Sequence, residues 1–339
     1  MFISGNPINQ FYLLLLNRLD NKKELKFMNY KYLFGPVPSR RLGISLGIDL
    51  VPFKTCSLDC IYCEVGKTTI LTDERKEYIP TDELISELDD FLGENPLLDF
   101  VTFSGAGEPT LNSGIGKIIS HLKKNYPKYK IALITNGTLF NDKKVRNEIL
   151  QSDLILPSLD AASQEVFEKI NRPVKTIFID EVIEGLSKLR SEFENKIWLE
   201  IFIIKNLNDT KDELQKLKNA LEKVKPDLVQ LNSLDRPGTE EWVESVPKKR
   251  MEEIAEFFHP FTVEIIAKYK KKNFESKQEA ELEEKIIGTL QRRPCTIDDL
   301  SNSLGISSKE ILRTVNELVK KNILIPQEKT RGVFYKVKT

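Results

Sequence analysis

Cysteine and histidine are scarce in this chain, which has four cysteines and two histidines among 339 residues. Neither sign of charge is in excess: lysine and arginine together number 51, and aspartate and glutamate together also number 51. No overall field therefore draws the protein toward nucleic acid or an anionic membrane. No hydrophobic run reaches the length that crosses a bilayer. We therefore expect a cytoplasmic protein with no membrane partner, long enough to bury one large domain and one small domain.

Three of the four cysteines stand within eight residues, in the stretch T-C-S-L-D-C-I-Y-C-E. Their spacing is C-x3-C-x2-C, formed by Cys56, Cys60 and Cys63. Disulfides do not explain it, because three thiols cannot pair off and a cytoplasmic chain keeps its thiols reduced. Structural zinc normally takes four ligands in spaced pairs. Only Cys295 remains, far downstream, and neither histidine lies nearby, so zinc fits poorly.

An iron–sulfur cluster fits this set of ligands better. Cuboidal clusters are held by cysteine thiolates, and three thiolates leave one iron with open coordination positions. An open iron is a place where a substrate can bind. We therefore expect a cluster that takes part in chemistry, held by Cys56, Cys60 and Cys63.

The three cysteines, with Tyr62 directly before the last of them, resemble the signature of the radical S-adenosylmethionine (radical SAM) superfamily. The resemblance implies a [4Fe–4S] cluster whose open iron chelates S-adenosylmethionine. It also implies reductive cleavage of that cofactor to a 5′-deoxyadenosyl radical, which abstracts hydrogen from a substrate, and an electron donor that supplies the reductant. Tyr62 is counted among the cofactor-binding residues on this basis.

Short apolar runs alternate with amphipathic helical patterns from residue 44 onward, which predicts a parallel sheet with helices outside. The predicted strands are 45–50, 99–103, 130–135, 154–158, 197–203 and 228–231. The predicted helices are 82–92, 114–125, 142–150, 163–170, 178–193 and 210–224. Six such units resemble the partial (β/α)6 TIM-like barrel of the superfamily, in which ligands bind at the carboxyl ends of the strands.

Polar or glycine-rich segments follow three of these strands. The second is followed by S-G-A-G-E-P-T, in which the resemblance gives Gly105, Gly107 and Glu108 a role in binding the methionyl amino group, mainly through backbone carbonyls. Asn136 follows the third strand, and Ser158 and Asp160 follow the fourth. The resemblance makes those three residues candidates for contacts to the ribose or methionyl carboxylate. A simple turn at Asn136 and a helix cap at Ser158 and Asp160 are the structural alternatives.

Two further segments have features of phosphate-binding sites. The stretch V-G-K-T-T after the cysteines mimics the end of a phosphate-binding loop, but Ile61 stands where that loop requires glycine, so triphosphate binding is not expected. The stretch F-G-P-V-P-S-R-R-L-G, residues 34–43, offers arginines that suit a phosphate or carboxylate. A solvated turn is the alternative. This stretch also resembles a branch of iron–sulfur oxidoreductases related to the tRNA wyosine-base synthases.

The chain changes character beyond residue 266. Lys268 to Asn273 reads as a basic linker, and the pattern after it is helix, helix, turn at Gly305, helix and two apolar runs. This order resembles a winged helix-turn-helix. Residues 268–339 carry 16 basic and 10 acidic residues, a modest excess for a nucleic-acid reader. Contact with nucleic acid and contact with protein both stay open, and Cys295 is expected to be a small buried hydrophobe.

The predicted organisation is an amino-terminal extension (1–28), a radical SAM core (29–266), a basic linker (267–278) and a winged helix-like domain (279–339). The function predicted from the resemblance is a radical SAM enzyme, with RNA or nucleobase modification favoured and a protein substrate as another possibility. One alternative is an iron–sulfur sensor that regulates DNA binding, and another is an activase that installs glycyl radicals in proteins. No residue beyond the cofactor and metal sites is assigned a catalytic role.

Overall fold

The computed structural model describes residues 30–39, 41–234, 238–266 and 279–338. The predicted extension 1–28 and linker 267–278 lie outside the described residues. Within the described ranges, no helix is both long and apolar enough to cross a membrane.

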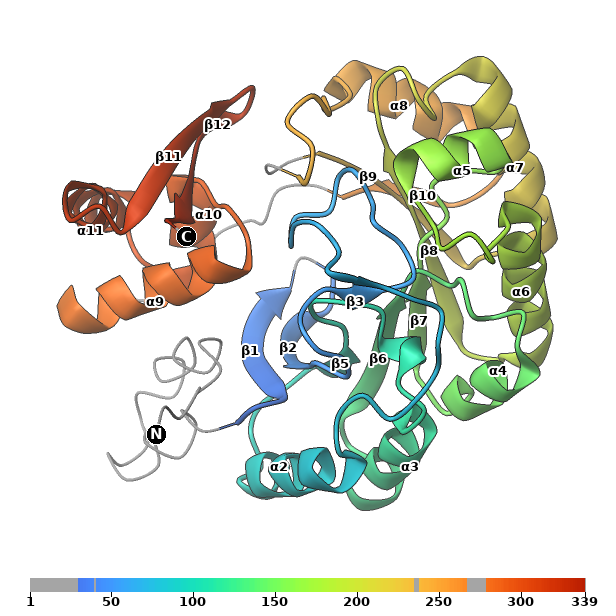
Figure 1. Cartoon of the computed structure of the whole chain (residues 1–339), viewed down its shortest axis with the longest axis horizontal. Coiled ribbons are helices and arrows are strands. Elements are labelled where there is room, and N and C mark those ends of the chain that lie inside the picture. Colours follow the sequence, from blue (N-terminus) through green and yellow to red (C-terminus); the bar gives the residue numbers. More distant parts are fainter. Residues whose placement is uncertain (1–29, 40, 235–237, 267–278, 339) are drawn as a thin grey trace.

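A single eight-stranded sheet forms the centre of the larger part of the molecule (Figure 1). Its strands run in the order β1-β2-β5-β6-β7-β8-β9-β10, with β1 antiparallel to β2 and the remaining neighbours parallel. The bounds are β1 Leu33–Ser39, β2 Gly43–Ile48, β5 Phe100–Phe103, β6 Lys130–Thr135, β7 Leu154–Pro157, β8 Lys196–Ile203, β9 Leu228–Ser233 and β10 Val263–Ile265. A parallel sheet in sequential order curls into an open barrel, which confirms the predicted fold class.

Helices between the parallel strands cover the outer face of this sheet, as Figure 1 shows. They are α2 Thr81–Gly93, α3 Ile115–Asn125, α4 Lys143–Ile149, α5 Gln164–Ile170, α6 Ile179–Glu192, α7 Lys211–Val224 and α8 Lys248–Phe257. Two of them begin at a side-chain cap: Asp142 accepts from the Lys144 amide at the start of α4, and Thr210 accepts from the Glu213 amide at the start of α7. Their apolar stripes pack on the strands in one large core.

Side chains of β8 show how the strands divide between the two faces of the sheet. Leu199, Ile201 and Ile203 pack in the large core under the helices. Trp198 and Phe202 belong to two other apolar clusters. Because successive side chains of a strand point to opposite faces, Glu200 shares the inner face with Trp198 and Phe202.

Strand β1 departs from the sequence prediction. The stretch 34–43 is predicted to offer arginines to a phosphate or carboxylate, with a solvated turn as the alternative, and no strand is predicted there. Residues 33–39 nevertheless pair with β2 and are buried at their start. Prolines are tolerated on an edge strand, where the missing amide hydrogen bond faces away from the sheet. The pairing is irregular between Phe34 and Val37, at the site of Pro36. Of the paired arginines, Arg41 reaches inward to the Glu200 carboxylate and to Gln230.

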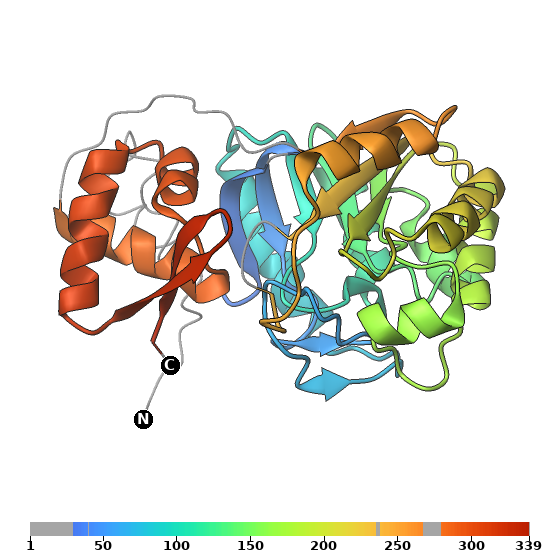
Figure 2. The same ribbon diagram turned by 90° about the horizontal axis from the view of Figure 1, so that it is seen from above.

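The carboxyl-terminal residues form a separate compact unit, shown to one side of the barrel in Figures 1 and 2. It contains α9 Glu279–Arg292, α10 Ile297–Leu304, α11 Ser308–Lys320, and a hairpin of β11 Leu324–Lys329 with β12 Gly332–Val337. These elements share their own apolar cluster. Cys295 is 1% exposed within it, as expected, and Gly305 ends α10 with a φ of 66°. The element order matches the prediction, and the winged-helix assignment stays a prediction. We call this part the C-terminal unit.

The C-terminal unit touches the barrel through the last turn of α9 and the residue after it. The Arg292 guanidinium lies 3.7 Å from the centroid of the Phe34 ring and donates to Asp49 at 3.4 Å. Arg293 lies 4.0 Å from the Glu64 carboxylate. Figure 2 shows the unit beside β1 and β2. Asp49 directly follows β2, and Glu64 directly follows Cys63, so the second contact is made beside the last cysteine of the motif.

Candidate functional site

The cysteine segment is a loop held at both ends by backbone pairing. It starts at β3 Thr55–Cys56, which pairs in parallel with β4 Ile70–Leu71. The Cys63 amide donates to the Cys60 carbonyl at 3.2 Å and the Ile61 amide donates to the Ile170 carbonyl at 2.9 Å. Cys56 and Cys63 both lie close enough to Cys60 to raise the pKa of its thiol, so the three cysteines are near one another.

Each cysteine sulfur accepts a hydrogen bond from a side chain outside the cysteine pattern. The Asn136 amide nitrogen lies 3.6 Å from the Cys56 sulfur, and that of Asn171 lies 3.4 Å from the Cys60 sulfur. The Lys54 ammonium lies 3.1 Å from the Cys63 sulfur. Three donors from three different segments therefore converge on the three thiols.

The thiols are poorly suited to remain uncompensated anions. Burial raises the pKa of Cys56 to about 12, and burial also raises the pKa of Cys60, with Asp160 acting in the same direction. Thiolates at these positions need positive charge. Within the described ranges, no group of three Cys, His, Asp or Glu side chains is arranged around a single metal ion. An iron–sulfur cluster, in which separate thiolates bind separate irons, fits these ligands.

The glycines after β5 let the next segment approach the cysteine loop. Gly105 has a φ of +124°, and a Cβ there would lie 1.7 Å from the Asp49 carboxylate. A Cβ at Gly107 would lie 2.1 Å from the Thr55 carbonyl. The Glu108 amide donates to that same carbonyl at 3.0 Å. Only glycine permits these contacts, so the segment fixes the residue next to Cys56.

Glu108 is 2% exposed, and its carboxylate binds inward. One oxygen accepts from the Thr110 amide and hydroxyl at 3.0 and 2.6 Å and from the Thr135 hydroxyl at 2.7 Å. The other accepts from the Asn136 amide at 2.7 Å. Burial raises the pKa of Glu108, and these donors oppose the rise. The side chain thereby ties the end of β5 to the end of β6.

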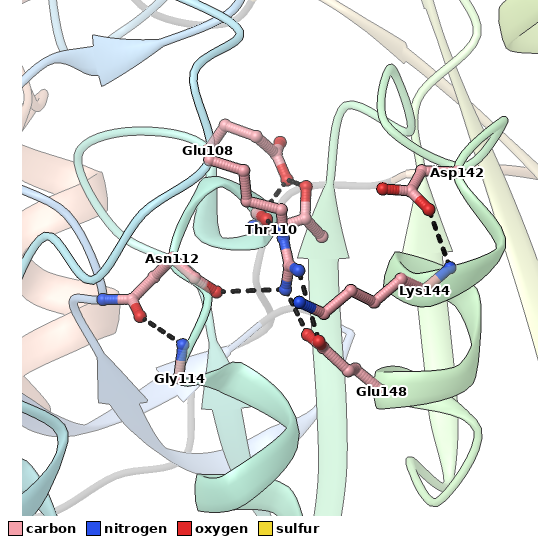
Figure 3. A network of polar contacts seen from close by, with 8 residues as sticks. Glu108, Thr110, Asn112, Gly114, Asp142, Lys144 and Glu148 are labelled. Carbon is pink, nitrogen blue, oxygen red and sulfur yellow. Dashed lines mark hydrogen bonds and ion pairs between the residues drawn. The ribbon is translucent and has the colours of Figure 1, made fainter.

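A second set of contacts holds the same turn from outside, as Figure 3 shows beside Glu108 and Thr110. The Arg75 guanidinium donates to the Thr110 carbonyl at 2.9 Å and to the Asn112 carbonyl at 3.4 Å. It also pairs with the Glu148 carboxylate of α4. The turn Pro109–Leu111 is therefore braced on both sides.

Asn136 links Glu108 to the cysteine loop. Its side-chain nitrogen donates to the Ser57 hydroxyl at 2.8 Å, and its oxygen accepts from the Thr138 amide and hydroxyl at 3.1 and 2.8 Å. Ser57 and Thr138 are in turn 2.8 Å apart. The residue is therefore more than a turn former, because it orients the loop that carries Cys56.

Asp160 and Tyr62 form a second buried network. The Tyr62 hydroxyl donates to Asp160 at 2.5 Å, Asn171 donates to the same oxygen at 2.7 Å, and the Phe202 amide donates to the other oxygen at 2.8 Å. The Tyr62 ring stacks on Phe202 with centroids 3.9 Å apart. Burial raises the pKa of Asp160 to about 6, and burial raises that of Tyr62.

One pocket brings together half of the predicted site residues. Its lining consists of Leu58, Cys60, Tyr62, Asn136, Ser158, Leu159, Asp160, Phe167, Asn171, Ile179 and Val182. Gly105, Gly107 and Glu108 lie outside this lining and act on the loop from behind. Ser158 comes from the end of β7 and forms a bridge with Glu200 of β8. Five candidates from two strand ends and one loop therefore meet at one place.

Sequence reasoning missed Lys54 and Asn171. Asn171 follows α5 in an ordinary helix-end position, and its buried side-chain oxygen has no hydrogen-bond partner among the described residues. Lys54 has a φ of 56°, a left-handed conformation. No spacing rule connects either residue to the cysteines, because tertiary packing alone brings them together.

The segment V-G-K-T-T does not form a phosphate-binding loop. Residues 65–69 connect Cys63 to the short strand β4, and the described chain has no helix directly after them. A phosphate-binding loop joins a strand to the amino terminus of a helix. The geometry therefore agrees with the exclusion made from Ile61.

Comparison with known proteins places these features in a family. The model of the radical SAM superfamily matches residues 50–218. A UPF0026 protein of Methanocaldococcus jannaschii is 33% identical over 89% of this chain and 94% of its own length. A protein of Brachyspira hyodysenteriae named GTPase Obg is 37% identical over 91% of this chain, which spans only 44% of that relative. A probable dual-specificity RNA methyltransferase of Aquifex aeolicus is 27% identical over 60% of this chain and 62% of its own length.

Among solved structures, a radical SAM methyltransferase from Sphaerobacter thermophilus superimposes with a TM-score of 0.51 at 15% identity. The match covers 65% of this chain and 66% of that one. At such low identity the likeness concerns the fold, which is the same open barrel.

Proposed function

This chain belongs to the radical SAM superfamily and to the UPF0026 family, and on that premise we propose that it cleaves S-adenosylmethionine reductively at a [4Fe–4S] cluster held by Cys56, Cys60 and Cys63. The observation that carries the proposal is the convergence of three partly buried cysteines and their three hydrogen-bond donors beside one pocket that Cys60 lines. A bound cluster supplies the electron for cleavage and an open iron for the cofactor.

The residues around the pocket have separate roles in this proposal. Tyr62, Asn136, Ser158 and Asp160 line it and are proposed to contact S-adenosylmethionine. Gly105 and Gly107 bring backbone carbonyls near the cysteine loop, and the buried Glu108 carboxylate holds that backbone in place. Exclusion of water follows from the apolar side chains Leu58, Phe167 and Val182 in the lining.

The test is an anaerobic cleavage assay. The protein is reconstituted with iron and sulfide, reduced with dithionite and given S-adenosylmethionine, and 5′-deoxyadenosine is quantified. We expect production in the wild type and its loss in Cys60→Ala. Cys295→Ala is the matched control, because it removes the one cysteine buried in the C-terminal unit. A loaded, reducible cluster that gives no cleavage even with cell extract present contradicts the proposal and favours the alternative of an iron–sulfur sensor.

We propose RNA as the substrate class. Support comes from the RNA methyltransferase relatives and from the excess of basic residues beyond residue 267. The C-terminal unit, read as a winged helix, would then present the RNA. We also propose an external electron donor and a cytoplasmic location, since clustered thiols need reducing conditions.

The test of the substrate class compares nucleosides by mass spectrometry. Total RNA from a strain that lacks the gene is incubated with reconstituted enzyme and S-adenosylmethionine. A nucleoside mass that appears only with enzyme, and not with Cys60→Ala, supports RNA. If 5′-deoxyadenosine production instead rises with a protein fraction and is insensitive to ribonuclease, the substrate is a protein, as a glycyl-radical activase would require.

A further inference from the structure

Lys54 stands directly beside the cysteine loop and is buried to 4% exposure. We propose that Lys54 sets the reduction potential of the cluster, by placing a positive hydrogen-bond donor on the Cys63 sulfur. Asn136 and Asn171 supply neutral donors to the other two sulfurs. The inference rests on the proposed function, because it requires a cluster on these three cysteines.

The Cys63 sulfur is the group that can supply negative charge to the Lys54 ammonium. Over the ranges that the structure describes, no carboxylate lies within ion-pair distance of it, and its side-chain hydrogen bond goes to Cys63 at 3.1 Å. A buried ammonium is strongly unfavourable unless it is paired with negative charge. Thiolates bound to a cluster provide that charge. The burial of Lys54 is therefore explained by a negatively charged group at the cysteines.

The backbone of Lys54 is held in an unfavourable conformation that aims this side chain. Its φ of 56° lies in the left-handed region, which is unfavourable for any residue other than glycine. The amide donates to the Ala106 carbonyl at 2.6 Å, and the carbonyl accepts from the amides of Thr69 and Ile70 at 3.0 and 3.1 Å. Contacts on both sides keep the residue there. Left-handed residues held in this way are frequent at functional sites.

The physical effect on the cluster has a definite sign. Reduction adds one electron, delivered by the external reductant, and makes no bond in the protein. A fixed positive charge and a hydrogen bond to sulfur both stabilise the more negative, reduced state, so they raise the potential. Lys54 brings both, whereas the two asparagines bring hydrogen bonds alone. Charge at close range in a buried site exceeds the effect of a neutral donor, so Lys54 is expected to dominate.

The experiment measures the midpoint potential of the reconstituted full chain, without S-adenosylmethionine, by a mediated dithionite titration followed by electron paramagnetic resonance. The variants are Lys54→Met, which removes charge and donor, and Lys54→Gln, which keeps a neutral donor. Lys67→Met is the matched control, because it removes an exposed lysine four residues beyond Cys63. Iron and sulfide are quantified in each protein to establish equal loading.

We expect the ratio of reduced to oxidised cluster at a fixed potential to fall at least tenfold in Lys54→Met. The fall in Lys54→Gln should be smaller, and Lys67→Met should stay within twofold of the wild type. If the Lys54 variants load the cluster and keep the wild-type ratio, the inference is wrong. Folded variants that both fail to load it also overturn the inference, since Lys54 would then serve assembly. A wild type that loads no cluster overturns the proposed function itself.

Discussion

Asp160 is an acid whose charge the fold disfavours. Burial raises its pKa to about 6, against the opposing effect of donors from Tyr62, Asn171 and the Phe202 amide, and nearby Glu200 acts with burial. Below the unfolded pKa of 3.8 Asp160 is protonated in the folded and in the unfolded chain, so its contribution to stability is fully present. As pH rises through about 6 the folded carboxyl must ionise in its buried site, and that contribution to stability is lost.

The first prediction follows from this sign. Asp160→Asn removes the titration while keeping the size of the side chain. The stability of the variant relative to the wild type should therefore increase by about 2 to 3 kcal/mol between pH 4 and pH 7. Urea unfolding of iron-free protein at several pH values measures it. A difference between the two proteins that is constant with pH would show that Asp160 does not titrate in this range.

Glu108 gives a second prediction at this scale. Both of its oxygens accept backbone amides, those of Thr110 and Asn136. In Glu108→Gln one oxygen becomes an amide nitrogen that must face a backbone N–H in either orientation. We expect a loss of about 2 to 3 kcal/mol, measured by urea unfolding. The exposed Glu165→Gln is the control and should change stability by less than about 0.5 kcal/mol. Equal behaviour of the two variants would contradict the bracing role of Glu108.

At the scale of elements, periodicity predicted the alternating strands and helices well because most of these elements obey a local rule, and the family resemblance implied the barrel. The strand 130–135 has the predicted bounds, and the helix predicted at 210–224 begins one residue later because Thr210 is its cap. The structure adds β1, β10 and α8. The prolines of β1 masked its strand pattern in the sequence. β10 is only three residues long, which is too short for a periodic signal.

The site was predictable only where its residues follow strand ends or form a spaced motif. Cysteine spacing identified Cys56, Cys60 and Cys63 as a group, and strand ends identified Asn136, Ser158 and Asp160 as neighbours in space. The inward direction of the Glu108 carboxylate and the approach of Lys54 and Asn171 depend on contacts between distant segments. No pattern along the chain encodes those contacts, so the structure was needed to find them.

The glycine segment gives a third prediction. A Cβ at Gly107 would lie 2.1 Å from the Thr55 carbonyl, so Gly107→Ala must displace the strand that carries Cys56. We expect at least a severalfold loss of bound iron per chain after reconstitution, measured by iron and sulfide analysis. Gly93→Ala, at the end of α2 where a Cβ meets nothing within 4 Å, is the control and should load normally. Full loading of the Gly107 variant would show that the loop tolerates the shift.

The whole molecule is joined through a small contact between its two parts. Arg292 stacks on Phe34 and binds Asp49, whose pKa burial raises while Arg292 opposes the rise. The other Asp49 oxygen accepts from the Ala106 amide at 3.1 Å. One aspartate thus receives a backbone donor from the glycine segment and a guanidinium from the C-terminal unit. That arrangement connects the C-terminal unit to the glycine segment.

The fourth prediction concerns this contact. Arg292→Ala leaves Asp49 without its cation and should cost about 1 to 2 kcal/mol, less than a fully buried pair because Arg292 is partly exposed. Arg292→Lys keeps the charge but loses the flat stacking on Phe34 and should fall between. Thermal unfolding gives the cost, and hydrogen exchange at residues 46–50 and 104–107 reports the loosening. Unchanged exchange in both variants would mean that the unit does not restrain the loop.

The Arg292–Asp49 contact also has a thermodynamic consequence for two binding equilibria. Suppose that a macromolecule bound to the C-terminal unit draws Arg292 away from Asp49 and thereby lowers the affinity of the protein for S-adenosylmethionine. By thermodynamic reciprocity, bound S-adenosylmethionine must then lower the affinity for that macromolecule by the same factor. Cofactor and partner would sense each other without touching, and a pair of binding isotherms, each measured with and without the other ligand, would return a single coupling constant.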